Sequence, residues 1–263
     1  MWKRTIIITI TLLVAALIVG VCDPGGDEPA LISLPVVVDG DEIAACVNDE
    51  GWTVEVSTFR LAVRDLEFTV EGEIHAGLSG RISELLIPTA LAHPGHLAGG
   101  DVTGELTGDF VLDLHADVEQ SLGRADLLVG EYHGFNLSFR VASESDGLDG
   151  NDPLLGHTAF IEGQATRGDD TVDFTAVLDV EDGTGMVGGT FNLDVTESTT
   201  STLVMRIHTI DPYENDTLFD GLDFLAIDDD HDGVALIEPG DEAHNVLAKT
   251  IVRHDHYGVI PQP

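Results

Sequence analysis

The clearest chemistry in this chain comes from histidines that have the close spacing of metal ligands. His93 and His96 flank a Pro-Gly turn, and His254 and His256 are one residue apart. A pair across a turn can converge on one ion, and residues at i and i+2 of an extended chain point to the same side. Neutral imidazole suits divalent transition metals such as Zn²⁺ and Cu²⁺. The two pairs predict a copper or zinc site if they meet in space; otherwise each histidine is a loop or capping residue.

Sulfur ligands are scarce, which bears on the identity of the metal. The chain has 3 methionines and 2 cysteines. Soft Cu(I) prefers thioether or thiolate ligands, so a methionine-rich copper carrier is disfavoured. Met205 falls in an apolar alternation that predicts a core position. Cys46 has apolar and acidic neighbours, which favour a small buried side chain over a reactive thiol.

A second set of ligands lies in an aspartate-rich segment near the C-terminus. Asp228, Asp230 and Asp232 occupy positions one, three and five of an EF-hand-like loop, and Gly233 occupies position six. Position twelve is a proline and Glu238 comes one residue early, so the closing carboxylate is out of register. These residues predict a structural calcium site with Asp228, Asp230, Asp232 and Glu238 as ligands. The alternative is an acidic Asp-Gly turn, which an aspartate-rich chain forms easily.

The overall charge excludes one large class of partners. The chain has 263 residues, with 11 Lys and Arg against 48 Asp and Glu, a formal net charge of -37. Such a chain repels a phosphate backbone, so no nucleic-acid partner is expected. The hydrophobic content of 43% is high enough for a packed core. The acidic surface resembles that of proteins adapted to high salt and also suits divalent cations.

The first 22 residues have the pattern of a targeting segment. Lys3 and Arg4 precede an apolar run over residues 5–21, and Cys22 precedes a Pro/Gly/Asp-rich stretch. The residues before Cys22 resemble a bacterial lipobox, although Val21 departs from the usual small residue. Lipidation of Cys22, an uncleaved anchor and a cleaved signal all remain open. Each predicts an extracytoplasmic location, in the periplasm or at the cell surface, either membrane-anchored or secreted. Any membrane contact is expected through the N-terminus alone.

The elements that must position these ligands are mainly strands. Apolar and polar residues alternate over segments 52–57, 66–70, 135–141, 172–180, 191–195 and 203–207, and Asp- and Gly-rich turns separate them. This pattern predicts a mostly β fold, an antiparallel β-sandwich or barrel with a short C-terminal helical appendage. The helix is expected to start at Asp241 and to present Leu247 and Ile251 on its apolar face.

Composition also suggests how the chain is divided. A linker is expected over residues 23–34, and the β-sandwich over residues 35–215. Residues 216–263 are expected to form an acidic loop and a helix packed on the sandwich, because this segment is too short for a core of its own.

Several short segments carry a resemblance to known proteins. They are Ala92–His96, Gly104–Leu106, Gly156–Thr158, Ala243–Asn245 and His254–Tyr257. With these segments the chain resembles a group of uncharacterised exported bacterial proteins, many of them predicted lipoproteins. More loosely, a β-rich exported chain with scattered histidines is similar to periplasmic copper-binding proteins. Both resemblances imply export, and the second implies metal binding.

Three classes of function follow from these patterns. The first is a non-enzymatic divalent-metal-binding protein that uses the histidine pairs, with calcium in a structural role. The second is a β-sandwich interaction or adhesion module with an unknown protein partner and at most a structural calcium site. A metal-dependent enzyme is the least favoured, because the sequence has no G-x-S-x-G and no H-E-x-x-H motif.

Overall fold

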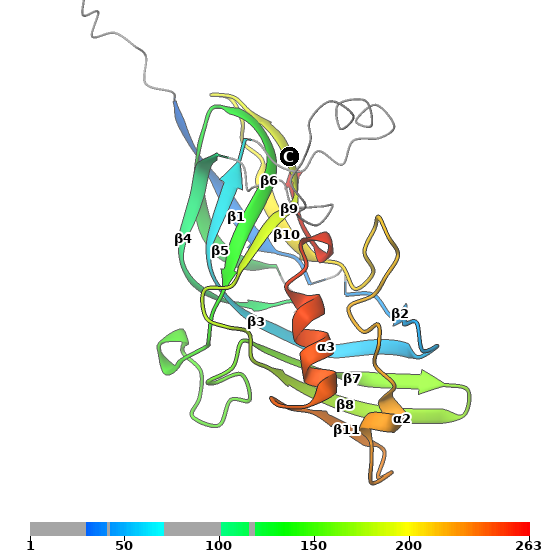
Figure 1. The fold of residues 1–263 in the computed structure, drawn as a ribbon. Helices are drawn as coiled ribbons and strands as arrows, with labels where there is room; N and C mark the ends of the chain where they lie inside the picture. Colours follow the sequence, from blue (N-terminus) through cyan, green and yellow to red (C-terminus); the bar gives the residue numbers. More distant parts are fainter. Residues whose placement is uncertain (1–29, 41–42, 71–100, 116–118) are drawn as a thin grey trace, which may run out of the picture. The chain divides into compact units, whose positions relative to one another are not determined.

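The computed structural model describes residues 30–40, 43–70, 101–115 and 119–263 (Figure 1). The predicted targeting segment with Cys22, and the pair His93 and His96, lie outside these residues. The strands are β1 (Leu31–Val38), β2 (Cys46–Val47), β3 (Thr53–Thr69), β4 (Val102–Asp113), β5 (Gln120–Leu128), β6 (Gly130–Phe139), β7 (Ala159–Arg167), β8 (Asp170–Leu178), β9 (Gly185–Val195), β10 (Thr202–Ile207), β11 (Val234–Ile237) and β12 (Tyr257–Gln262). The helices are α2 (Phe224–Ile227) and α3 (Glu242–Ile251), with 3-10 turns η2 (Glu144–Asp146) and η3 (His254–His256).

The predicted fold class is confirmed, since the described residues are mainly strands with a small C-terminal helix. Strand β8 shows how the alternation of apolar and polar residues predicts a strand with one buried face. Its residues Val172, Phe174, Ala176 and Leu178 are buried, and the residues between them are more exposed. A period of two places these four side chains on one face, where they face the core.

The hydrogen-bonded strands close into a ring around β3. This strand has 17 residues; its first half pairs with β7, and its second half pairs with both β4 and β6. The ring passes through eight strands, β3-β4-β5-β1-β10-β12-β9-β6, and returns to β3. Strands β7, β8 and β11 extend the sheet beyond the ring. Among the described strands the pairs β1–β10, β8–β11 and β9–β12 are parallel, so the sheet is mixed rather than wholly antiparallel.

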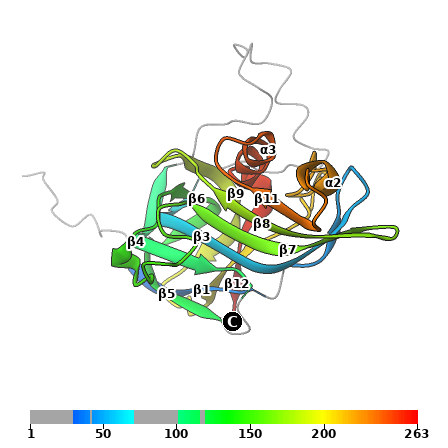
Figure 2. The same ribbon diagram turned by 90° about the horizontal axis from the view of Figure 1, so that it is seen from below.

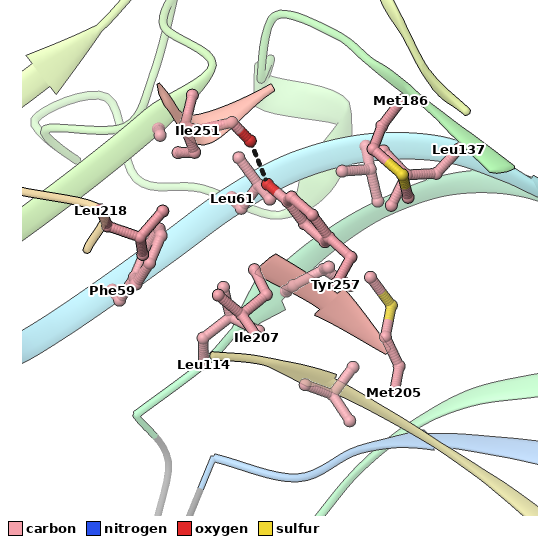
Figure 3. Close-up of a cluster of buried hydrophobic side chains, with 14 of the residues drawn as sticks. Phe59, Leu61, Leu114, Leu137, Met186, Met205, Ile207, Leu218, Ile251 and Tyr257 are labelled. Atoms are coloured by element: carbon pink, nitrogen blue, oxygen red, sulfur yellow. Dashed lines mark hydrogen bonds between the residues drawn. The ribbon is translucent and has the colours of Figure 1, made fainter. Parts of the chain in front are cut away.

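Side chains fill the inside of the ring (Figure 3). Met205 and Met186 are fully buried there, which confirms the core position predicted for Met205. The hydroxyl of Tyr257 donates a hydrogen bond of 2.6 Å to the carbonyl oxygen of Ile251 and so joins β12 to the end of α3. Burying each large apolar side chain contributes roughly 1.5–3 kcal/mol. An eight-stranded ring is just wide enough to be filled by such side chains.

A second part of the core lies under the extension of the sheet. The rings of Trp52 and Phe224 meet edge to face with centroids 5.7 Å apart, and Phe174 lies 5.1 Å from Phe224. The indole of Trp52 also donates to Asp223, the residue that caps α2. Figure 2 shows α2 and α3 on the same side of β7, β8 and β11. This packing fixes the start of the aspartate-rich loop that follows α2.

The C-terminal segment contributes more than the expected loop and helix. Residues 216–263 also supply β11, which pairs with β8, and β12, which lies between β9 and β10. Strand β11 has 4 residues, and β12 has 6 residues that include a proline. Such short segments show little alternation of apolar and polar residues, so the sequence did not predict them as strands. Strand β1 begins at Leu31, inside the stretch expected to be a linker, and it also contains a proline. No described helix has the length and apolar character needed to cross a bilayer.

Candidate metal centres

The aspartate-rich loop between α2 and β11 brings three of the predicted calcium ligands together. Asp228, Asp230 and Asp232 each offer a carboxylate oxygen, and these oxygens all lie within 4.8 Å of one another. Calcium binds oxygens at 2.3–2.6 Å, so ligands on opposite sides of one ion lie roughly 5 Å apart. The spacing therefore fits a single cation of that size.

Local hydrogen bonds build the loop around the Asp228 side chain. Asp228 is 3% exposed, and its two carboxylate oxygens accept the backbone N–H groups of Asp232 and Gly233, each at 3.0 Å. The carboxylate of Asp232 accepts the N–H of Val234 at 3.0 Å. Gly233, with φ +90°, and His231, with φ +58°, take left-handed backbone conformations. Gly233 takes its conformation at little cost, and together these features turn the chain back toward Asp228.

The fourth predicted ligand, Glu238, is not a member of this group of carboxylates. It does line the same groove, which has a volume of about 690 Å³ and also contains Asp230 and Asp232. The acidic residues along the groove are Asp223, Asp229, Asp230, Asp232, Glu238, Asp241 and Glu242. A groove lined by charges of one sign raises the local concentration of cations. Its electrostatics therefore support the same ligand chemistry as the loop.

The C-terminal histidine pair lies on the η3 turn and not in extended chain, because the chain must turn between α3 and β12. His256 is fully buried, and its Nδ1 lies 2.9 Å from the carbonyl oxygen of His208. A carbonyl can only accept, so Nδ1 carries the proton and Nε2 keeps its lone pair. Burial lowers the pKa of His256 and outweighs the hydrogen bond to His208, which favours the charged form. The Nδ1 of His254 lies 2.6 Å from Asp255 instead.

This geometry gives the two histidines different surroundings. Neither belongs to a group of three or more close ligand atoms within the part of the chain that the structure describes. The expectation that both rings of the pair point to one side rested on an extended chain, and the turn removes that basis.

Other histidines have structural partners. The Nε2 of His244, on α3, accepts the backbone N–H of Asp179 at 3.0 Å. The Nδ1 of His157 lies 2.8 Å from the carboxylate of the same aspartate. His244, which is buried, therefore fixes the chain after β8 against α3, and His157 ties the same aspartate to the loop before β7.

The structure also reveals a group of carboxylates that the sequence analysis missed. Asp211, Glu214 and Asp216 offer oxygens within 4.8 Å of one another. They share a short loop after β10, in which the Asp211 N–H donates to the Asp216 carbonyl at 2.8 Å. Their D-x-x-E-x-D spacing does not match an EF-hand loop, so no known ligand motif indicated these residues. What the sequence does show is three acidic residues within the six positions 211–216.

Comparisons with protein-family models, with curated proteins and with solved structures give no match for this chain. The resemblance to exported bacterial proteins, which rests on short segments such as Ala92–His96, therefore stays a prediction.

Proposed function

We propose that this chain is an exported, non-enzymatic protein that binds divalent cations, and that its principal site is the loop of Asp228, Asp230 and Asp232. The observation that carries the proposal is the convergence of these three carboxylates around the buried Asp228. Oxygen ligands suit hard cations, which favours Ca²⁺ over copper or zinc at this loop. The acidic groove beside it adds attraction for any cation.

The role of the ion in this proposal is structural. The loop joins α2, which packs on Trp52 and Phe174, to β11 at the end of the sheet. An ion that binds the folded loop and not the unfolded chain stabilises this connection by mass action. With three carboxylates and no closing bidentate glutamate, we expect a dissociation constant of about 10⁻⁴–10⁻³ M, the range of extracellular calcium modules. That range of dissociation constants agrees with the proposed export, which rests on the targeting pattern of residues 1–22.

A transition-metal site of histidines is the second proposal for the same protein. The buried, neutral His256, with a lone pair on Nε2, favours it. His93, His96 and His254 would supply the other imidazoles. Zinc or copper titration of the full chain, compared with the H93A/H96A variant, tests this proposal. Equal metal content in both proteins would overturn the shared histidine site.

Calcium titration of the full chain by isothermal calorimetry tests the main proposal. The informative variant is D230N/D232N, because each asparagine keeps an oxygen that can accept the local N–H groups. The matched control is D169N/D170N, which removes the same two charges from the β7–β8 turn. We expect the first variant to lose calcium affinity by at least about tenfold and the control to bind like the parent. Equal affinities in all three proteins would overturn the proposal and favour a β-sandwich interaction module.

A further inference from the structure

The loop after β10 holds a second cluster of carboxylates, well separated in sequence from the Asp228 loop. It consists of Asp211, Glu214 and Asp216, and an isolated bridge between Ile210 and Thr217 closes the loop. The N–H of Asn215 donates to the carbonyl of Asp211 at 3.0 Å, inside the loop. The backbone thus holds the three acidic side chains on one tight turn.

Two carboxylate oxygens in this cluster are screened from water and have no hydrogen-bond partner among the described residues. One is Oδ2 of Asp211, a residue that is fully buried; its Oδ1 accepts the Tyr213 N–H at 2.7 Å. The other is Oδ1 of Asp216, whose Oδ2 pairs with Arg253. A buried anionic oxygen without a partner is strongly disfavoured. Both oxygens are therefore available to bind a cation.

Arg253 is the cation that the structure places beside the cluster, and its charge is not sufficient. Its guanidinium pairs with Asp216, lies 3.6 Å from Glu214, and also contacts Asp255 at 3.3 Å. One positive charge is thus shared among three carboxylates, while Asp211 adds a further buried carboxylate. The net charge around the loop stays negative.

His256 supplies an independent sign of an unfilled interaction near this loop. The residue is fully buried, and its Nε2 has no hydrogen-bond partner among the described residues. Its Nδ1 bonds to the carbonyl of His208, three residues before Asp211. Arg253, three residues before His256, pairs with Asp216. A bare Nε2 is an acceptor, so a water molecule bound nearby can donate to it.

We propose that Asp211, Glu214 and Asp216 bind a second hard divalent cation, and that a water on this cation donates to Nε2 of His256. The cluster provides only oxygens, and their spacing within 4.8 Å matches a cation of the size of Ca²⁺. This inference goes beyond the proposed calcium site and does not rest on it, because the two carboxylate groups share no residue. It competes with the proposed histidine site for the lone pair on Nε2 of His256.

The luminescence of bound Tb³⁺, used as a probe for a calcium site, measures ion binding at this loop directly. Tyr213 lies between Asp211 and Glu214 and is 47% exposed, so it can transfer excitation to an ion bound at its own loop. The full chain carrying D230N/D232N lacks two of the three carboxylates of the first site. In this protein we expect a saturable emission that Ca²⁺ displaces and that the Y213F substitution largely abolishes.

Two further variants make the test specific. The side chain of Glu214 is 72% exposed, so E214Q leaves the fold intact, and we expect it to weaken Tb³⁺ binding by at least about tenfold. D211N keeps an acceptor for the Tyr213 N–H and is expected to weaken binding in the same direction. D169N/D170N, the control, is expected to change nothing.

The outcomes separate this inference from the proposed function. Absence of an emission that Ca²⁺ displaces, or equal binding by E214Q, D211N and the control, would overturn the second site alone. Retention of the Tyr213-sensitised emission, together with a calcium affinity that is equal in the parent and D230N/D232N, would support the second site and overturn the proposed function.

Discussion

Arg140 is the residue on which several elements of the ring depend. Its side chain is 2% exposed and donates to the carbonyl oxygens of Val63, on β3, and Phe110, on β4. Two of its nitrogens also pair with the two carboxylate oxygens of Asp146, at 2.7 and 2.9 Å. A buried guanidinium is tolerated because this carboxylate and the carbonyl oxygens satisfy its N–H groups.

Removing the charge of Asp146 is therefore expected to be costly. The D146N variant leaves the buried Arg140 with the exposed Asp109, 3.6 Å away, as its remaining charged partner among the described residues. We expect the free energy of unfolding to fall by about 3–5 kcal/mol. Urea denaturation followed by circular dichroism measures the change. E144Q, an exposed change in the same turn, serves as the control and is expected to stay close to the parent. A D146N variant as stable as E144Q would contradict this role of Arg140.

The same pair predicts a dependence of stability on pH. Burial opposes ionisation of Asp146, but the hydrogen bonds and charge of Arg140, with the Ser143 N–H, outweigh it and lower its pKa. The folded state therefore binds this proton less readily than the unfolded state. The stabilisation is present above the ordinary pKa of an aspartate and is lost as the pH falls through the lowered pKa. The stability difference between the parent and D146N should shrink on acidification, and a difference independent of pH would argue against this assignment.

At the scale of elements, Asn48 connects the β2–β3 hairpin to the segment that leads into α2. The residue is 4% exposed, and its amide donates to the carbonyl oxygens of Phe219 and Leu222, at 3.0 and 2.9 Å. Its Oδ1 accepts the N–H of Trp52 at 2.9 Å. One side chain thus joins segments that lie far apart in the sequence.

We expect the N48A variant to lose about 2–4 kcal/mol of folding free energy. It removes three hydrogen bonds and leaves buried carbonyl and N–H groups without partners. Because the segment held by Asn48 precedes the Asp228 loop, calcium affinity should fall as well. E50Q, an exposed change in the same hairpin, is the control for both measurements. Unchanged unfolding and calcium binding in N48A would show that this connection is dispensable.

The sequence could predict elements whose signal is local. The alternation in β8 and the helix around Leu247 and Ile251 follow from side-chain period alone, as does the Asp228 loop from its spacing. Strands β11 and β12 depend on pairing with β8, β9 and β10, which no local pattern encodes. Likewise, the partners of His256 and the orphan oxygens around Asp211 arise from tertiary packing.

At the scale of the whole molecule, the net charge of -37 dominates the response to ions. Repulsion among carboxylates disfavours the folded state at low ionic strength. Salt shortens the screening length from about 30 Å at 0.01 M to about 3 Å at 1 M. We expect the melting temperature to rise steadily with NaCl, and to rise further with CaCl₂ at matched ionic strength. The extra rise in melting temperature with CaCl₂ should be smaller in D230N/D232N than in D169N/D170N. Equal rises in the two variants would show that calcium acts on this protein by screening alone.

The position of a bound ion shows whether the Asp228 loop is a calcium site. An anomalous difference map from crystals of the full chain grown with Tb³⁺ shows where the ion lies. We expect a peak within about 2.3–2.6 Å of carboxylate oxygens of Asp228, Asp230 and Asp232. A map without a peak at this loop, from protein that remains folded in the crystal, would contradict the claim.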